Sequence, residues 1–396
     1  MSSPYLHGGH ARVIVAVDTV FLSKQFRHTG TGVYLFNVLS ECLRIAGIAT
    51  PHVEFHGFIA ANDNWAINGF VSPFLRVHRA PVLARRRLWQ LGGMAIHTAR
   101  VRPDLVFLPT CYSLPGRCAP VVTTILDAMA KRLPLGLVEH ATRLRAMTWL
   151  NAKLARKIVT ISSWSKQDLV EIYGLDPEKV EVTYLGYDKR FYNEIAPDPE
   201  ASAALLARFG IRQPFALHHG MVQLRKNVQR LIQAWDLVMD RNKTFDAQLV
   251  LAGPMGFGHE QILKVREASP HRDQIILTGA LPDAELATLV KNASLCVVPS
   301  LYEGFCLPMV EAMACGVPTV ASNSSCIPEV SGRLLEYFDP HSVEEMAETI
   351  RLALEDSGVR DRLRHAGLAR AAEFSWERCA RETMRIFAET SASHGQ

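Results

Sequence analysis

The sequence predicts an α/β protein with two facing Rossmann-like domains, and three observations support this prediction. At 396 residues, the chain is longer than a single hydrophobic core usually supports. Short apolar runs alternate with longer amphipathic stretches, a pattern typical of parallel strands joined by crossover helices. The alternation forms two series, and the segment between them, residues 193–202, is rich in Pro, Ala and acidic residues, as a connector would be.

The apolar runs locate the predicted strands. In the first domain these strands are 13–17, 55–59, 105–108, 121–126, 158–161 and 180–185. In the second domain they are 215–218, 249–252, 275–277, 295–298 and 319–321. We therefore expect the first domain to cover residues 1–195 and the second to cover residues 196–374. The tail, residues 375–396, predicts a closing helix, because Trp376, Cys379, Ala380, Met384, Phe387 and Ala388 recur with a roughly helical period.

Composition excludes several classes of protein. Hydrophobic residues make up 48% of the chain, yet no uninterrupted apolar stretch reaches the roughly 18 residues that a membrane-spanning helix needs. The first residues are not those of a secretory signal. The eight cysteines show neither a Cys-x-x-Cys pair nor the Cys/His spacing of a metal site, which favours reduced thiols. The expected location is the cytoplasm.

The charge is distributed unevenly along the chain. The net charge is +4, but residues 1–166 hold 20 Lys and Arg against 7 Asp and Glu, so this part carries +13 and the remainder −9. A basic first half indicates an anionic partner, either the phosphates of a substrate or an anionic membrane surface, and nucleic acid is less favoured. Arg85, Arg86 and Arg87, with Arg76 and Arg79, predict a basic patch; the alternative is a solvated helix face.

Two carboxylates, Glu303 and Glu311, stand eight positions apart across a predicted strand-to-helix turn. Pro308 suits the first helical position and Gly316 the end of this helix. Free N–H groups at such a helix start can receive a pyrophosphate, and the two carboxylates can accept hydrogen bonds from sugar hydroxyls. A lone acidic residue in a first helical turn is more often explained by the helix dipole.

A second candidate element is the loop that starts at Gly220 and carries Arg225, Lys226 and Asn227 to a predicted helix. Two adjacent cations at a helix entrance can stabilise a departing diphosphate, most strongly in the transition state. Such a site would need no metal. The alternative is a solvated helix start.

In the first domain, Gly30 and Gly32 follow the first predicted strand and permit close approach of a ligand to the backbone. The dinucleotide fingerprint would need a third glycine where this chain has Leu35, so a nicotinamide enzyme is disfavoured.

The segment Glu303-Gly304-Phe305-Cys306-Leu307-Pro308, followed by Glu311 and the run to Pro318, resembles the signature of the retaining glycosyltransferases of family 4. The resemblance implies a GT-B fold with an acceptor-binding first domain, a nucleotide-sugar-binding second domain, and a last helix that crosses back to the first domain. It also implies that the Arg-Lys-Asn segment contacts the donor diphosphate, that Gly279 to Leu281 line the base pocket, and that the first Gly-x-Gly turn lies over the donor phosphate.

At one position the chain departs from this family. Many relatives read His-Asp where this chain has Leu126 and Asp127. His28, His218 and His219 are candidates to replace the missing imidazole. The segment from Ser162 to Lys166 also resembles the family, and helix capping by Ser163 or Ser165 explains it without any chemistry.

The expected reaction is metal-independent transfer of a hexose with retention, and the leading hypothesis is mannose moved from GDP-mannose to a lipid-linked or polysaccharide glycan at the membrane surface. The alternatives are the same chemistry on a soluble small acceptor, and a noncatalytic sugar-nucleotide-binding protein. No cofactor is expected besides the nucleotide-sugar co-substrate. The expected catalytic residues are Arg225, Lys226, Glu303 and Asp127, and the expected donor-binding residues are Gly30, Gly32, Gly220, Gly279, Leu281, Gly304, Phe305, Cys306, Leu307 and Glu311.

Overall fold

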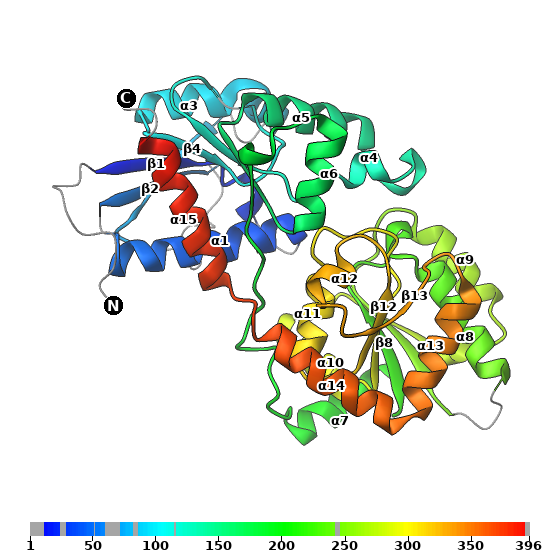
Figure 1. Cartoon of the computed structure of the whole chain (residues 1–396). Coiled ribbons are helices and arrows are strands. Elements are labelled where there is room, and N and C mark those ends of the chain that lie inside the picture. Colours follow the sequence, from blue (N-terminus) through cyan, green and yellow to red (C-terminus); the bar gives the residue numbers. More distant parts are fainter. Residues whose placement is uncertain are drawn as a thin grey trace.

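The chain folds into two α/β lobes, as the computed structural model shows (Figure 1). The structure describes residues 12–23, 29–50, 52–59, 72–81, 86–114, 116–241 and 246–392. Each lobe holds one sheet in which every recorded strand pairing is parallel. The predicted fold class is confirmed.

The first sheet has seven strands in the order β3-β2-β1-β4-β5-β6-β7. Its strands are β1 (Val13–Val17), β2 (Val53–Ile59), β3 (Leu75–Arg79), β4 (Leu105–Leu108), β5 (Val121–Thr124), β6 (Lys157–Thr160) and β7 (Val180–Val182). The helices around it are α1 (Gly30–Ile48), α2 (Arg86–Leu88), α3 (Met94–Val101), α4 (Met129–Arg132), α5 (Ala141–Leu154) and α6 (Ser163–Tyr173). The central strands β4 and β5 are buried along their whole length, as expected for a parallel sheet covered on both faces.

The second sheet has six strands in the order β10-β9-β8-β11-β12-β13. Its strands are β8 (Phe215–His219), β9 (Gln248–Ala252), β10 (Ile275–Gly279), β11 (Leu295–Val298), β12 (Thr319–Ser322) and β13 (Glu336–Phe338). Its helices are α7 (Pro199–Phe209), α8 (Val228–Arg241), α9 (His259–Ala268), α10 (Asp283–Asn292), α11 (Leu307–Ala314), α12 (Ile327–Val330), α13 (Val343–Glu355) and α14 (Ser357–Ala371). The strand order reverses between β8 and β11, and parallel sheets bind ligands at such a switch point.

The last helix, α15 (Trp376–Ala392), crosses back to the first lobe, as the red helix of Figure 1 shows. It packs against α1, β4 and β6, and the rings of Phe107 and Phe387 lie 4.9 Å apart. Where the chain crosses, a Cβ atom at Gly186 would lie 2.0 Å from the backbone nitrogen of Trp376. Only glycine fits at this crossing.

Two strands were missed by the sequence prediction. The β3 strand carries Arg76, His78 and Arg79 and is mostly exposed at the edge of its sheet, so it lacks the apolar signature. The β13 strand is only three residues long and also lies at an edge. Among the described residues, no helix is both long and apolar enough to cross a membrane.

Candidate functional site

The carboxyl edge of the second sheet is built from glycines whose backbones pack on one another. The N–H of Gly220 donates to the carbonyl of Ala252 at 2.8 Å, and the N–H of Gly253 donates to the carbonyl of Gly279 at 3.0 Å. A Cβ atom at Gly253 would lie 1.9 Å from the carbonyl oxygen of Gly220, and all three glycines have positive φ. The turns after β8, β9 and β10 therefore form one continuous floor.

The loop after β8 ends in a single helical turn that carries both predicted cations, Arg225 and Lys226. Asn227 follows with φ 59° and is buried. Its side-chain amide donates to the carbonyls of Pro299 and Pro340, at 3.0 and 2.7 Å. The carbonyl of Arg225 in turn accepts the N–H of Leu301 at 2.9 Å. These bonds join the cation-bearing loop to the loop after β11.

Glu303 is the centre of the charged cluster. Its carboxylate lies 2.5 Å from Lys226 Nζ and 3.3 Å from Arg225 Nη1, and Glu303 and Lys226 are each only 6% exposed. Burial alone raises the pKa of Glu303, but the two cations outweigh it and lower that pKa to about 2. Its backbone N–H donates to Ser325 Oγ at 2.9 Å. Glu303 is therefore ionised at neutral pH and holds both cations in place.

Helix α11 begins and ends where the sequence predicts. Pro308 lies in its first turn, Glu311 is the fifth of its residues, and Gly316 follows it with φ 68°. Cys306 precedes the helix with φ 68°, in the left-handed region that favours glycine. The side chains of Cys306 and Phe305 are buried, and the ring of Phe305 packs 5.2 Å from that of Phe374. These two residues expose little but backbone to a ligand.

Glu311 has a buried partner that the sequence prediction did not assign to it. Nε2 of His219 lies 3.2 Å from Oε2 of Glu311, and Nδ1 of His219 lies 3.9 Å from Sγ of Cys296. Burial raises the pKa of Tyr192, and the carboxylates of Glu311 and Asp283 raise it further. Asp283 opens α10, two residues after Leu281 of the predicted base pocket.

Asp127 of the first lobe meets the same loop from the other side. A Cβ atom at Gly304 would lie 3.1 Å from both Cβ and Oδ2 of Asp127. Burial raises the pKa of Asp127, and the Met129 N–H and the guanidinium of Arg225 only partly offset this shift. The structure therefore brings together the four predicted catalytic residues, Arg225, Lys226, Glu303 and Asp127. Leu126, at the position of the family histidine, packs against the hydrophobic core.

Further bonds between the lobes surround this cluster. The carboxylate of Glu329 accepts the first N–H groups of α6, from Ser163 at 2.7 Å and Trp164 at 2.8 Å. The hydroxyl of Tyr302 donates to Asp168 at 2.7 Å. Glu329 and Tyr302 were not predicted, because nothing local in the sequence marks a residue whose partner is more than 130 positions away.

The helix cap of α6 differs from the predicted one. Ser162, rather than Ser163 or Ser165, is the N-cap residue, and its Oγ accepts the N–H of Ser165 at 3.0 Å. The reason is that only Ile161 and Ser162 lie between the end of β6 and the start of α6, so the first serine takes the cap position.

The predicted glycine pair of the first lobe lies within the first turn of α1. Gly30 opens the helix, and the N–H of Gly32 donates to Oγ1 of the cap residue Thr29 at 3.2 Å. Among the described residues, a Cβ atom at Gly30 would meet nothing within 4 Å. The described contacts of this pair do not reach the Glu303 cluster.

The remaining candidates lie elsewhere or outside the described residues. His28 and Arg85 lie outside the described residues, and only the backbone of Arg86 is described, whereas Arg87 is exposed. Arg76 pairs with the buried carboxylate of Glu54. His218 is buried, and its Nδ1 lies 3.2 Å from the carbonyl of Val297.

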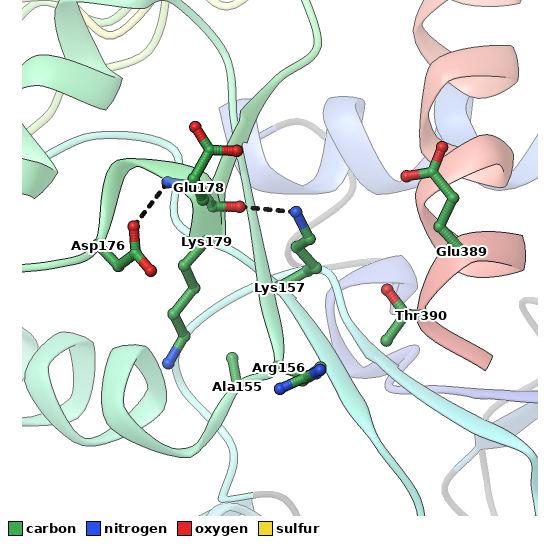
Figure 2. A pocket seen from close by; sticks show the side chains of 8 residues that line it. All are labelled: Ala155, Arg156, Lys157, Asp176, Glu178, Lys179, Glu389 and Thr390. Carbon is green, nitrogen blue, oxygen red and sulfur yellow. Dashed lines mark hydrogen bonds between the residues drawn. The ribbon is translucent and has the colours of Figure 1, made fainter. Parts of the chain in front are cut away.

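A separate surface concavity of about 430 Å³ lies beside α15, where Figure 2 shows its lining residues. Lys157 there donates to the carbonyl of Glu178 at 2.6 Å and pairs with Glu181 at 3.0 Å. The N–H of Glu178 donates to Asp176 at 2.9 Å. This concavity holds none of the predicted site residues.

The chain is similar to known proteins over both lobes. The family model "Glycosyl transferases group 1" matches residues 208–370, and "Glycosyltransferase Family 4" matches residues 31–191. O-antigen chain mannosyltransferase B of Escherichia coli is 30% identical over 391 residues, which cover 93% of this chain and 98% of that protein.

Two solved structures share the fold. Sucrose-phosphate synthase from Thermosynechococcus elongatus has a TM-score of 0.74 at 18% identity, over 96% of this chain and 100% of its own. Anabaena HepE in complex with UDP and glucose has a TM-score of 0.71 at 17% identity, over 95% and 100% of the two chains. These likenesses show a shared fold of two α/β lobes.

Proposed function

Since this chain belongs to family 4 of the glycosyltransferases (glycosyl transferases group 1) and has their GT-B fold, we propose that it transfers a mannosyl group from GDP-mannose, with retention, to a growing polysaccharide or lipid-linked glycan. The observation that carries this proposal is the cluster in which Glu303 binds both Lys226 and Arg225 while Asp127 of the other lobe adjoins it. Similarity to a mannosyltransferase supports the choice of sugar.

The two cations act on the leaving group. As the bond between the anomeric carbon and the β-phosphate oxygen breaks, the electron pair stays on the diphosphate, whose negative charge grows. Lys226 and Arg225 stabilise this charge best if they are already oriented, and the ionised carboxylate of Glu303 orients them. This arrangement needs no metal ion, so metal independence is part of the proposal.

The acceptor hydroxyl attacks the same face of the sugar that the diphosphate leaves. A new bond forms between its oxygen and the anomeric carbon, and its proton passes to an oxygen of the departing phosphate. No protein nucleophile takes part. The lobes hold the acceptor hydroxyl beside the departing phosphate on that face of the sugar, which is the main contribution of such a cleft. Asp127 and Glu303 accept hydrogen bonds from hydroxyls of the transferred sugar.

Glu311 has a different task from Glu303. Its carboxylate, in α11, hydrogen-bonds to the ribose hydroxyls of the nucleotide, and we place the base at the Gly279–Leu281 turn. Gly220 and Gly279 offer backbone there, and the start of α11 at Leu307 provides N–H groups for the phosphates.

The proposal is tested by measuring how a panel of nucleoside diphosphates shifts the melting temperature of the protein. GDP should raise the melting temperature well above the shifts given by UDP and ADP, and GDP-mannose should then be turned over with release of GDP. A larger shift with UDP would overturn the choice of base. Binding of a sugar nucleotide without turnover on any glycan acceptor would favour a noncatalytic binding protein.

The glycan acceptor is proposed to be presented at an anionic membrane surface, because the first 166 residues carry a net charge of +13. Arg87 is an exposed contributor. Replacing Arg85, Arg86 and Arg87 with Glu should abolish sedimentation with phosphatidylglycerol-containing vesicles. Unaltered sedimentation would contradict membrane binding through these residues, and turnover on soluble oligosaccharides alone would favour a small acceptor.

A further inference from the structure

A concavity of about 630 Å³ lies between the two lobes, on the side of α9. One wall is the stretch from residue 135 to residue 143, which leads into α5, and the other is Phe257 in the loop after β9. This volume is within the usual range of small-molecule sites. Because both lobes contribute to it, the concavity lies at the mouth of the cleft.

The position of Phe257 is fixed by the loop that carries the catalytic cations. Gly256 N–H donates to the carbonyl of Val222 at 2.9 Å, and Leu224 N–H donates to the carbonyl of Phe257 at 3.1 Å. A Cβ atom at Gly256 would lie 2.7 Å from Met221, and one at Gly258 would lie 2.4 Å from Leu224. The two loops can pack this closely only because both flanking residues are glycine.

This packing leaves the ring of Phe257 38% exposed, in the concavity. Exposing a large aromatic side chain on a tightly anchored loop gives no stability to the fold. Such a ring is well suited to contact a ligand, because little conformational freedom remains to be lost on binding.

The opposite wall combines apolar and hydrogen-bonding groups. Leu135 is 55% exposed, and Val138 lies beside it in the lining. The guanidinium of Arg143 is held by Oε1 of Gln90, which is buried. Glu139 adds a carboxylate, 65% exposed and 3.5 Å from Nε2 of His140, so the wall carries both signs of charge.

We propose that this concavity is an acceptor subsite that binds one sugar ring of the acceptor glycan. The ring lies with its C–H face on Phe257, and its hydroxyls bond to Arg143 and Glu139. A wall with one cation and one carboxylate matches a neutral polyhydroxyl ligand better than an anionic headgroup. The subsite rests on the proposed function, and it is one loop away from Arg225 and Lys226, so a glycan bound here can reach the donor.

The test is acceptor kinetics with Phe257→Ala, and Met255→Ala is the matched control. Met255 lies in the same loop and is 40% exposed, but it does not line the concavity. Phe257→Ala should raise the KM for a glycan acceptor on the order of 10-fold, which an aromatic contact readily supplies, and leave the KM for GDP-mannose and the rate of donor hydrolysis unchanged. Phe257→Trp should keep the acceptor KM near that of the wild type.

Arg143→Met, on the facing wall, should raise the acceptor KM as well. Among the described residues, Arg143 has no bond to the loop that carries Arg225 and Lys226, so this variant tests the subsite independently of that loop. An unchanged acceptor KM in Phe257→Ala would overturn the subsite. An equal rise in the donor KM would also overturn it, since Phe257 would then act only through the loop that carries Arg225 and Lys226.

A binding experiment separates this subsite from the proposed function. Saturation-transfer NMR with oligosaccharides ending in mannose, galactose, glucose or N-acetylglucosamine needs no turnover. At least one oligosaccharide should receive saturation from the wild-type protein. This transfer should be lost with Phe257→Ala and kept with Met255→Ala. No transfer with any of them would overturn the subsite, whatever the donor proves to be.

Discussion

Nε2 of His219 lies 3.2 Å from Oε2 of Glu311, and the histidine side chain is only 1% exposed. Because Nδ1 lies next to the thiol of Cys296, we assign the proton of the ring to Nε2, which then donates to the carboxylate. One oxygen of Glu311 is thereby fixed, and the other is left for a ligand. On the proposed function, we infer that His219 positions Glu311 for the nucleotide.

Replacing His219 tests this relationship. His219→Phe should weaken GDP binding on the order of 10-fold, because a hydrogen bond to a charged group is lost, whereas His219→Gln keeps a donor and should bind nearly as the wild type does. Calorimetry measures both. The control ligand is 2′,3′-dideoxy-GDP, which has no ribose hydroxyls and should bind all three proteins with similar affinity. Equal loss with both nucleotides would show that His219 acts only on the fold.

Lys226→Ala should lower kcat at saturating donor on the order of 10²-fold, because the contact with the diphosphate strengthens as the leaving group gains charge. Steady-state kinetics over a range of GDP-mannose concentrations measures this. Lys291→Ala is the control and should turn over normally, because this half-buried lysine of α10 donates to Asn193 and has no bond to Glu303. A rise in the donor KM with unchanged kcat would mean that Lys226 binds the donor equally well in the ground state and in the transition state.

Activity should survive excess EDTA. On the proposed mechanism, the two cations held by Glu303 supply the charge that a metal ion would otherwise provide to the diphosphate. The measurement is the initial rate of transfer before and after the enzyme is dialysed against EDTA. Loss of activity that Mg²⁺ or Mn²⁺ restores would contradict metal independence.

Gly304→Ala should lower kcat about 10-fold with little change in the melting temperature, because the added Cβ would lie 3.1 Å from Asp127 and hold the two lobes apart. Gly92→Ala is the control, since a Cβ there meets nothing within 4 Å. Wild-type turnover in Gly304→Ala would mean that this contact between the lobes is not needed for catalysis.

Stability should fall as the pH drops from about 6.5, the pKa of histidine in the unfolded chain. Burial and the nearby Lys226 lower the pKa of His218 to about 3, so between these two values the unfolded chain binds a proton that the folded protein does not. At pH 5 this difference costs about 2 kcal/mol. Thermal melts from pH 7 to pH 5 should show a smaller decline for His218→Gln than for the wild type. Equal declines would contradict the assignment.

The sequence allowed the parts of the site that lie within one loop to be predicted. Glu303, Pro308 and Gly316 follow a local strand-to-helix pattern, and the structure has helix α11 at that place. Partnerships between distant segments left no such pattern. The bond of His219 to Glu311 and that of Glu329 to the start of α6 exist only once the sheets and lobes have assembled.

The edge strand β3 and the cap at Ser162 show the same limit at a smaller scale. From the sequence alone, the arginines of β3 predict a basic patch. In the structure, β3 pairs with β2, and Arg76 forms an ion pair with Glu54 of that strand. Three serines within four residues offer equivalent caps, and only the end of the preceding strand decides among them.

The configuration of the first product formed from GDP-mannose tests the central claim most directly. The donor is the α-anomer, so the wild-type enzyme should give an α-linked mannoside, observed by proton NMR during the first turnovers, and Glu303→Gln should form the same product at a greatly reduced rate. A β-linked product, or full activity in Glu303→Gln, would contradict the proposal that cations fixed by Glu303 drive a retaining transfer.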